Sequence, residues 1–280
     1  MVFVGVNLDL SLDVEDLARC YWVEAARAVV LHPFYGRELS QEEEEVLSQL
    51  SADGGLVILD MTQGIFSDKR YDFVDYYVGS LRKWFPMPDG GYLEANGALL
   101  PSVEELKENV PFVSDQRDAM YLRGQYFRSG DAGLKCISVR LNKRAEGQSL
   151  DDIHRMSDFS LGVFAGVDID ATYRVRMDNF AQLFELRSSA CRVARSPFAS
   201  LDLVATSPLY FPMYVEDVLS VQSFFAGEGI YCPRLWPVDY PEVLVSDGVR
   251  YIYEHLLCVP VDQRYGAVEM QQIVNLMREL

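Results

Sequence analysis

The stretch that decides the fold covers Gly55–Leu93 and reads GLVILDMTQGIFSDKRYDFVDYYVGSLRKWFPMPDGGYL. Its first apolar run, Leu56–Leu59, has the length and composition of a buried strand and ends on Asp60. A second apolar run, Tyr76–Gly79, is followed within a few residues by Lys83, after which prolines and glycines interrupt the chain. The sequence therefore predicts two buried strands, one followed by a carboxylate and the other by an amine.

Strands and helices alternate in the sequence before this stretch. Ala28–Leu31 is an apolar strand that ends ahead of a proline, which cannot continue a central ladder. Ser40–Glu43 has the pattern of a capping box and opens a helix, in which we expect Glu42–Glu45 to be solvent-exposed. This alternation is typical of a parallel sheet. We therefore expect the α/β class, with a mainly parallel sheet flanked by helices.

Several polar side chains follow the predicted strands. In open parallel sheets, ligands bind at the carboxyl ends of the strands. His32, Asp60 and the segment Ser80–Lys83 all lie at such ends, so we expect them at one edge of the sheet. The alternative for His32 is a strand-end histidine bonded to the backbone. The alternative for Asp60 is a strand-end cap.

A carboxylate and a lysine at strand ends have a joint chemical meaning. Pyridoxal phosphate (PLP) needs a lysine that binds it as a Schiff base and an acid that keeps its pyridine nitrogen protonated. Lys83 must be neutral to attack an aldehyde, and burial together with the neighbouring Arg82 is expected to lower its pKa. The alternative for Lys83 is a surface cation whose aliphatic stem packs on apolar neighbours.

Two segments carry a family resemblance. LDMTQGIFS over residues 59–67, followed by SLRKWFPMPDGG over residues 80–91, resembles the core of the fold-type-I PLP enzymes and, within them, the DegT/DnrJ-type sugar aminotransferases. The resemblance implies that Lys83 carries PLP as a Schiff base and that four further residues lie at the cofactor. These are Asp60 at the pyridine nitrogen, Gln63 at the ring hydroxyl, Ser80 at the phosphate and His32 facing the active site.

The resemblance also implies a function and partners. It predicts an aminotransferase that acts on an amino or keto sugar, linked to a nucleotide, and that takes its amino group from a second substrate. The family forms homodimers, so the same is expected here. The alternative is a catalytically inactive or truncated family member that serves as a non-catalytic subunit.

The resemblance divides the chain into two domains. Residues 1–165 correspond to the PLP-binding large domain, and residues 166–280 to the interdomain helix and a smaller C-terminal α/β domain. The match begins at VGVNLDLSLDVEDL, residues 4–17, which aligns after the family's phosphate-binding turn. We therefore expect a large domain that is N-terminally short and binds PLP weakly, because the N–H groups of such a turn hold the phosphate.

Composition and charge argue against several other classes of protein. The chain of 280 residues has a net charge of -17, which disfavours binding to nucleic acids or anionic membranes. No apolar run is long enough for a membrane-spanning helix. The five cysteines are scattered without a CxxC pair, and the three histidines lack zinc-binding spacing. We therefore expect a cytoplasmic protein without a metal site.

Overall fold

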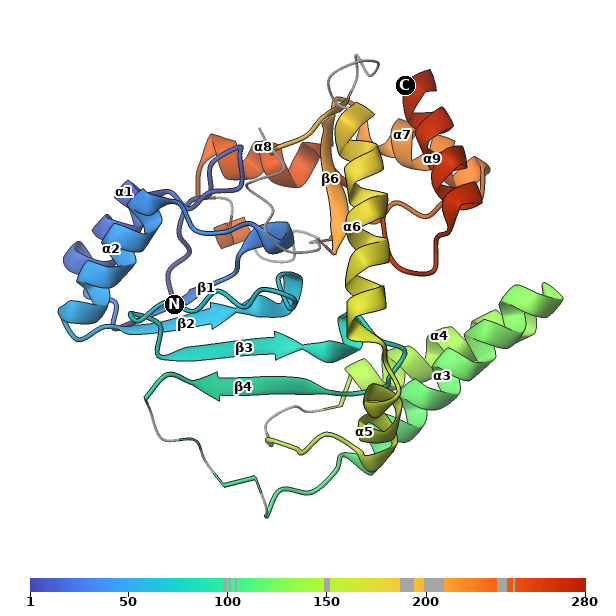
Figure 1. Ribbon diagram of the computed structural model, residues 1–280, viewed down its shortest axis with the longest axis horizontal. Helices are drawn as coiled ribbons and strands as arrows, with labels where there is room; N and C mark the ends of the chain where they lie inside the picture. The colour runs from blue at the N-terminus through green and yellow to red at the C-terminus, as the bar shows by residue number, and fades with distance from the viewer. Residues whose placement is uncertain are drawn as a thin grey trace. The chain divides into compact units, whose positions relative to one another are not determined.

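The computed structural model describes residues 1–97, 100, 102–103, 105–148, 152–186, 194–198, 209–235, 241–243 and 245–280 (Figure 1). The chain divides into two compact units. The first unit contains Met1–Tyr76 and Ile169–Leu280, and the second contains Tyr77–Asp168. The boundary after Tyr76 lies inside a strand. The boundary after Asp168 lies close to residue 165, where the sequence places the end of the large domain. The division into two domains at residue 165 stays a prediction.

Two β-sheets lie within the described residues. The first has the strand order β1 (Ala28–Leu31), β2 (Leu56–Asp60), β3 (Tyr76–Ser80) and β4 (Gly91–Ala95). β1 and β2 are parallel, whereas β4 runs antiparallel to β3 (Figure 1). The second sheet is antiparallel and consists of β5 (Ala194–Arg195), β6 (Tyr210–Val215) and β7 (Leu256–Pro260). The predicted α/β class is confirmed, with a first sheet that is mixed.

The helices divide between the two units. The first unit contains α1 (Val14–Ala18), the π-helix η1 (Arg19–Val23), α2 (Gln41–Ala52), α6 (Ile169–Leu186), α7 (Val218–Gly227), α8 (Asp247–His255) and α9 (Ala267–Glu279). The second unit contains α3 (Val110–Ser129), α4 (Ala132–Glu146) and α5 (Asp158–Ala165). Short 3-10 helices are η2 (Phe34–Gly36), η3 (Met61–Gln63), η4 (Leu81–Lys83) and η6 (Pro241–Val243). None of the described helices has both the length and the apolar composition needed to cross a membrane.

α2 packs against β2 and begins where the sequence predicts. The side chain of Ser40 accepts a hydrogen bond from the N–H of Glu43 at 3.3 Å. The Glu43 carboxylate in turn accepts one from the N–H of Ser40 at 2.6 Å, which completes the predicted capping box. Leu47 and Leu50 of this helix are fully buried. A Cβ on Gly55 would overlap with the Leu50 side chain, so glycine allows the helix to approach the start of β2.

The core of the first unit joins segments from both ends of the chain. Most of its apolar side chains come from β6, β7, α6, α7 and α9, and they include Phe180, Phe211 and Phe225. Tyr35 of η2 enters the same core, where its side chain is 0% exposed. Its hydroxyl oxygen lies 3.1 Å from the sulfur of Cys258. The turn that follows β1 is therefore anchored in the C-terminal part of the unit.

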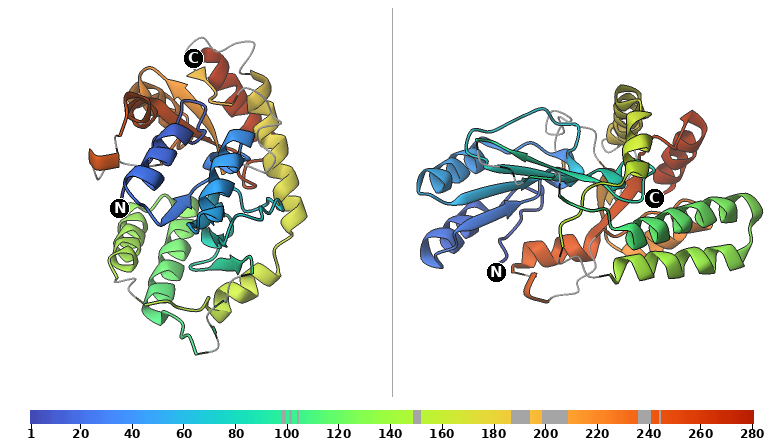
Figure 2. Two further views of the ribbon diagram at one scale, coloured as in Figure 1. Left: turned by 90° about the vertical axis from the view of Figure 1, so that its left-hand side faces the viewer. Right: turned by 90° about the horizontal axis from the view of Figure 1, so that it is seen from below.

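The second unit combines β4 and most of β3 with three helices. α3 and α4 form an antiparallel hairpin (Figure 2). Phe85, in the turn after η4, contacts Phe164 of α5 with 5.4 Å between the ring centroids. The carboxylate of Asp89 accepts a hydrogen bond from the N–H of Ser157, the residue that caps α5, at 2.8 Å. The segment between β3 and β4 is thus held by both packing and hydrogen bonds.

Two predictions about the N-terminal part were wrong in detail. The alternation of apolar and polar residues over 2–10 predicts a short strand, but these residues form no strand, and only an isolated bridge joins Val6 to Leu12. The spacing of apolar residues predicts a helix over Asp13–Arg27 with Asp13 as its N-cap. The helix starts at this cap but changes to a π-helix after Ala18. It ends before Ala25, whose φ of 56° lies in the left-handed region and cannot continue a right-handed helix.

Two differences in the second unit have local causes. The sequence predicts a helix over Ser102–Val110, but among the described residues of this range only Val110 is helical, as the first residue of α3. The Asn109 side chain caps α3 by accepting from the N–H of Phe112 at 3.2 Å. Pro111 in the first turn has no N–H, so it cannot donate the hydrogen bond that a helix running in from earlier residues would need there. α4 was not predicted. Its buried residues are Ser138 and Ala145, whereas the larger apolar side chains of Ile137 and Val139 are exposed.

Gly91 at the start of β4 gives a direct test of how closely β3 and β4 approach. A Cβ on Gly91 would lie 2.8 Å from the carbonyl oxygen of Gly79. Gly91→Ala is therefore expected to lower the free energy of unfolding by about 1–3 kcal/mol, as overpacking does. Gly124→Ala in α3 is the control, because its Cβ has nothing within 4 Å and alanine favours a helix. Urea unfolding measures both changes, and equal effects would contradict the steric cause.

Candidate functional site

The register of β1 and β2 places His32 beside Asp60. Leu31 is opposite Leu59 in this parallel pair, so the next residue of each strand lies at the same carboxyl end. The Nδ1 atom of His32 lies 3.6 Å from a carboxylate oxygen of Asp60. The His32 ring also packs edge-on against Phe34, with 5.4 Å between the ring centroids. Two side chains that the sequence places at strand ends are therefore neighbours.

Asp60 also caps the short helix that follows β2. Its Oδ1 atom accepts a hydrogen bond from the N–H of Thr62 at 2.9 Å, at the start of η3. Partial burial raises the pKa of Asp60, but its interactions with His32 and Thr62 outweigh this effect and lower the pKa to about 2. The carboxylate is therefore ionised at neutral pH. The capping role considered from the sequence is present, and it leaves the second carboxylate oxygen facing His32.

Removing this charge is expected to change how stability depends on pH. Because the pKa of Asp60 is lower than its usual 3.8, the carboxylate stabilises the fold above pH 3.8, and this contribution is lost as the pH falls towards about 2. Asp60→Asn is therefore expected to be less stable than the parent near neutral pH and almost equal to it near pH 2. Urea unfolding across this range, with the exposed Asp72→Asn as control, measures the difference. A difference that does not vary with pH would contradict the prediction.

Gln63 fixes the turn that follows His32. Its side chain is 4% exposed, and its Oε1 atom accepts a hydrogen bond from the backbone N–H of Tyr35 at 2.7 Å. Tyr35 has φ 55° and ψ 30°, a left-handed conformation that is uncommon for a bulky residue. Because Tyr35 uses the carbonyl end of the Gln63 amide, the Nε2 end can serve only as a donor to a further group. Sequence reasoning missed Tyr35, for which the only signal is the turn-forming glycine that follows it.

Ser80 and Lys83 lie at the two ends of one turn in the second unit. Ser80 is the last residue of β3, and η4 follows it directly and ends at Lys83. Partial burial and the charge of Arg82 lower the pKa of Lys83, whereas Glu146 acts in the opposite direction. The net direction is the one that a nucleophilic lysine needs. The Lys83 side chain is nevertheless exposed, which also fits the alternative of a surface cation.

The predicted site residues thus fall into two groups. His32, Asp60 and Gln63 lie in the first unit, around the carboxyl ends of β1 and β2. Ser80 and Lys83 lie in the second unit, at the end of β3. Within each unit the predicted residues are brought together. That all five contact one cofactor stays a prediction.

No family model matches the chain, and no curated protein matches it.

Solved structures, by contrast, share the fold along nearly the whole chain. The sugar aminotransferase CalS13 from Micromonospora echinospora matches with a TM-score of 0.64 at 13% identity, over 99% of this chain and 74% of that chain. A DegT DnrJ EryC1 StrS aminotransferase from Brucella abortus matches with a TM-score of 0.66 at 14% identity, over 99% and 72%. DesI, solved in the presence of its TDP-sugar product, matches with a TM-score of 0.65 at 14% identity, over 99% and 68%. At these identities the similarity establishes the aminotransferase fold.

Proposed function

We propose that the protein is a PLP-dependent aminotransferase that acts on an amino or keto sugar linked to a nucleotide. The observation that carries the proposal is the likeness of 99% of the chain to structures that are named as aminotransferases, of which CalS13 is named as a sugar aminotransferase. Because one fold can host several functions, the residues at the strand ends must also suit the chemistry.

The residues of the first unit suit the ring of PLP. The pKa of Asp60 is lowered to about 2, so its carboxylate is ionised at neutral pH. An acid that pairs with a protonated pyridine nitrogen must be ionised in this way. The Nε2 group of Gln63 can donate a hydrogen bond to an acceptor such as the ring oxygen, while its Oε1 atom accepts from Tyr35. His32 lies beside Asp60 and restricts the orientation of its carboxylate. When bound, PLP supplies an electron sink for the charge that develops on the substrate carbon.

The residues of the second unit suit the covalent and proton-transfer roles. The Nζ atom of Lys83 must lose its proton before it attacks an aldehyde, and the lowered pKa favours this loss. The same nitrogen is then able to take a proton from one carbon atom and deliver it to another, as a general base and acid. The hydroxyl of Ser80 is a donor that suits a phosphate oxygen.

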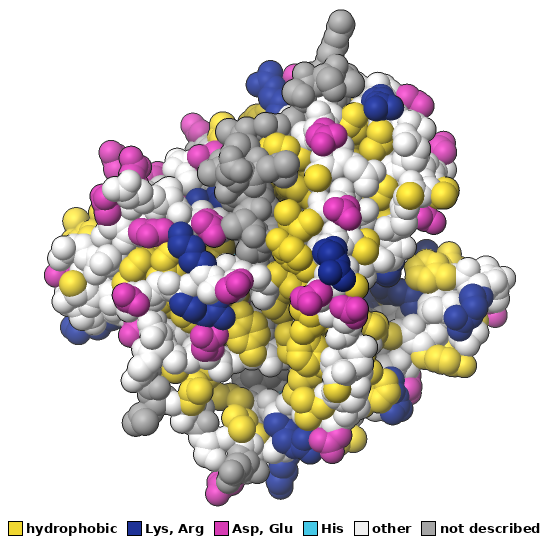
Figure 3. Space-filling model, viewed as in Figure 1, with side chains coloured by type: hydrophobic (Ala, Val, Ile, Leu, Met, Phe, Trp, Pro, Cys, Tyr) yellow, Lys and Arg dark blue, Asp and Glu magenta, His cyan; other side chains and the backbone are white. Residues whose placement is uncertain are grey.

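The sugar substrate, the amino donor, a homodimer and a cytoplasmic location belong to the same proposal. The solved structure of DesI with its TDP-sugar product supports the choice of a nucleotide-linked sugar. Acidic and basic side chains are interspersed over the face that Figure 3 displays, which offers no broad basic surface there for a nucleic acid. The exposed free thiol of Cys136 suits a reducing compartment.

The proposal is tested by amino-group transfer with the purified protein. The protein is incubated with PLP, a TDP-linked keto sugar and each of a panel of L-amino acids, and mass spectrometry detects the TDP-linked amino sugar. Asp60→Asn is expected to keep the fold but to lower the rate, because a neutral amide does not favour a protonated ring nitrogen. Absence of the amino sugar with every donor would overturn the proposal.

A further inference from the structure

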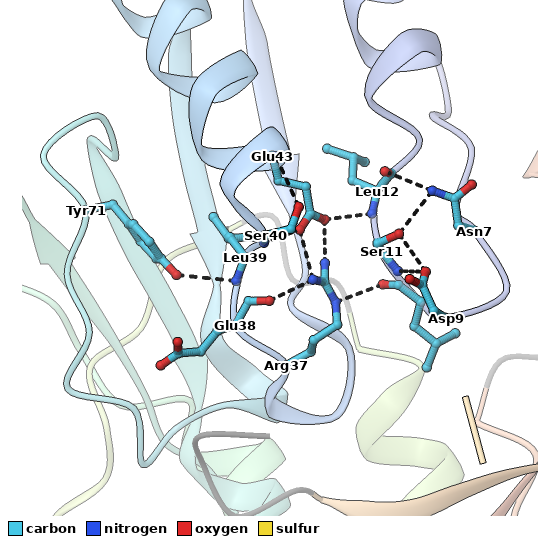
Figure 4. Close-up of polar contacts among 11 residues, drawn as sticks. Asn7, Asp9, Ser11, Leu12, Arg37, Glu38, Leu39, Ser40, Glu43 and Tyr71 are labelled. Atoms are coloured by element: carbon cyan, nitrogen blue, oxygen red, sulfur yellow. Dashed lines mark hydrogen bonds and ion pairs between the residues drawn. The ribbon is translucent and has the colours of Figure 1, made fainter. Parts of the chain in front are cut away.

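A buried ion pair joins three segments beside the turn that follows β1 (Figure 4). Its members are Glu43, which is 1% exposed, and Arg37, which is 8% exposed. The two carboxylate oxygens of Glu43 accept from two guanidinium nitrogens of Arg37, one of them at 2.8 Å. They also accept from the backbone N–H groups of Leu12 at 2.7 Å and Ser40 at 2.6 Å. Each oxygen of this carboxylate therefore receives two hydrogen bonds.

Arg37 directs further donors to the backbone. Its Nε atom donates to the carbonyl oxygen of Leu10 at 3.2 Å, and its Nη1 atom donates to that of Glu38 at 2.7 Å (Figure 4). Leu10 has a left-handed φ of 66°, so the N-terminal loop is held in an uncommon conformation at this contact. The ion pair thus fixes the N-terminal loop, the turn after β1 and the first turn of α2 to one another.

The turn between His32 and Arg37 is short and strained. Tyr35 and Gly36 adopt left-handed conformations in succession, with φ values of 55° and 75°. The N–H of Arg37 donates to the carbonyl oxygen of Phe34 at 3.1 Å, which closes the turn. A strained turn of this kind persists only where the surrounding structure holds it. Gln63 holds its middle through Tyr35, and the ion pair holds its far end.

Net stability is a poor explanation for a buried pair of charges. The desolvation of two charges offsets most or all of their attraction, so an apolar pair of similar volume is often as stable. An apolar pair, however, does not fix the orientation of the segments around it. The hydrogen bonds between Arg37, Glu43 and the backbone are charge-assisted and have fixed geometry. Orientation of the three segments is therefore the better explanation.

We propose that Arg37 and Glu43 are positioning residues, which lock the turn after β1 so that the His32 ring faces Asp60. The importance of this arrangement for catalysis rests on the proposed function, in which Asp60 and His32 belong to the cofactor site. The arrangement itself rests on contacts within the first unit.

The test reads the orientation of the His32 ring by ¹⁵N NMR of the whole protein at about pH 8, above the usual imidazole pKa. A neutral imidazole carries its proton on one ring nitrogen, and a carboxylate that faces Nδ1 favours the proton on that atom. His32 is therefore expected to be mainly the Nδ1–H tautomer in the parent protein. In the double variant Arg37→Met/Glu43→Leu, which removes both charges together, His32 is expected to shift towards the Nε2–H tautomer.

The two remaining histidines are internal controls. The Nδ1 atom of His154 lies 3.2 Å from the carbonyl oxygen of Lys107, and that of His255 lies 2.9 Å from the carbonyl oxygen of Val215. Both are expected to keep the Nδ1–H tautomer in every variant. A folded double variant with an unchanged His32 signal would show that the pair is only structural and would overturn the proposal. The measurement involves no PLP, so its outcome is independent of whether the protein is an aminotransferase.

A second variant covers the case in which the double variant does not fold. Arg37→Lys keeps a positive charge beside Glu43 but lacks the planar fork of the guanidinium group. A partial shift of the His32 tautomer is expected, and an unchanged tautomer would again overturn the proposal. The matched control is Asp115→Leu/Arg144→Met, which removes an ion pair of the second unit. It is expected to leave His32 unchanged, and an equal shift there would show that the effect is not specific to the pair.

Discussion

Lys83→Ala is expected to abolish both the covalent binding of PLP and the transfer of an amino group. Alanine offers no amine to attack the aldehyde of PLP. It also removes the nitrogen that is proposed to move the proton, and a positioned acid–base group of this kind typically contributes about 10²–10⁴-fold to a rate. The loss of covalent binding is measured as the loss of the yellow colour of the PLP–lysine Schiff base. Borohydride reduction followed by peptide mass mapping identifies the lysine that carries PLP.

Lys69→Ala is the matched control for this experiment. The Nζ atom of Lys69 lies 2.9 Å from a carboxylate oxygen of Glu44 and 3.5 Å from one of Glu38. Burial opposes the effect, but these carboxylates raise the pKa of Lys69, so its amine stays protonated and cannot attack an aldehyde. Lys69→Ala is therefore expected to bind PLP as the parent does. PLP found on Lys69 or another lysine, with Lys83 unmodified, would refute the assignment.

The parts of the fold that the sequence predicted correctly depend on local chemistry. The capping box at Ser40 involves side chains and N–H groups within one turn, and residue type alone determines it. Leu56–Asp60 forms a strand because its apolar run is bounded by glycine and by polar residues. The neighbouring positions of His32 and Asp60 then follow from the parallel pairing of two such strands.

The parts that the sequence did not predict depend on contacts between distant segments. Glu43 was expected on an exposed face, together with its acidic neighbours. It is buried because Arg37 and the N–H of Leu12, both outside its helix, meet its carboxylate. The left-handed conformation of Tyr35 likewise depends on Gln63 and on a core formed by the C-terminal part of the chain. No local pattern contains this information.

Glu43→Leu is expected to lower the free energy of unfolding by about 3–5 kcal/mol, because it leaves a buried charge without its partner. Arg37 is only 8% exposed, so water cannot replace the carboxylate without a rearrangement of the turn. The backbone N–H groups of Leu12 and Ser40 lose their acceptor at the same time. Urea unfolding near neutral pH measures the loss. Glu42→Leu is the control, since it removes the same charge from the same helix turn at an exposed position and is expected to change stability by less than about 1 kcal/mol.

The double variant Arg37→Met/Glu43→Leu separates the two causes of this loss. If the uncompensated charge of Arg37 dominates, removing it as well is expected to restore most of the stability, because a well-packed apolar pair often equals a buried ion pair. If the double variant is as unstable as Glu43→Leu alone, the lost acceptor for Leu12 and Ser40 is the cause instead. A double-mutant cycle compares the parent, Arg37→Met, Glu43→Leu and the double variant. The interaction free energy from this cycle measures the coupling of the two side chains directly. A restored stability combined with a changed His32 tautomer would show that the pair is retained for the orientation of the turn, since stability alone does not require it.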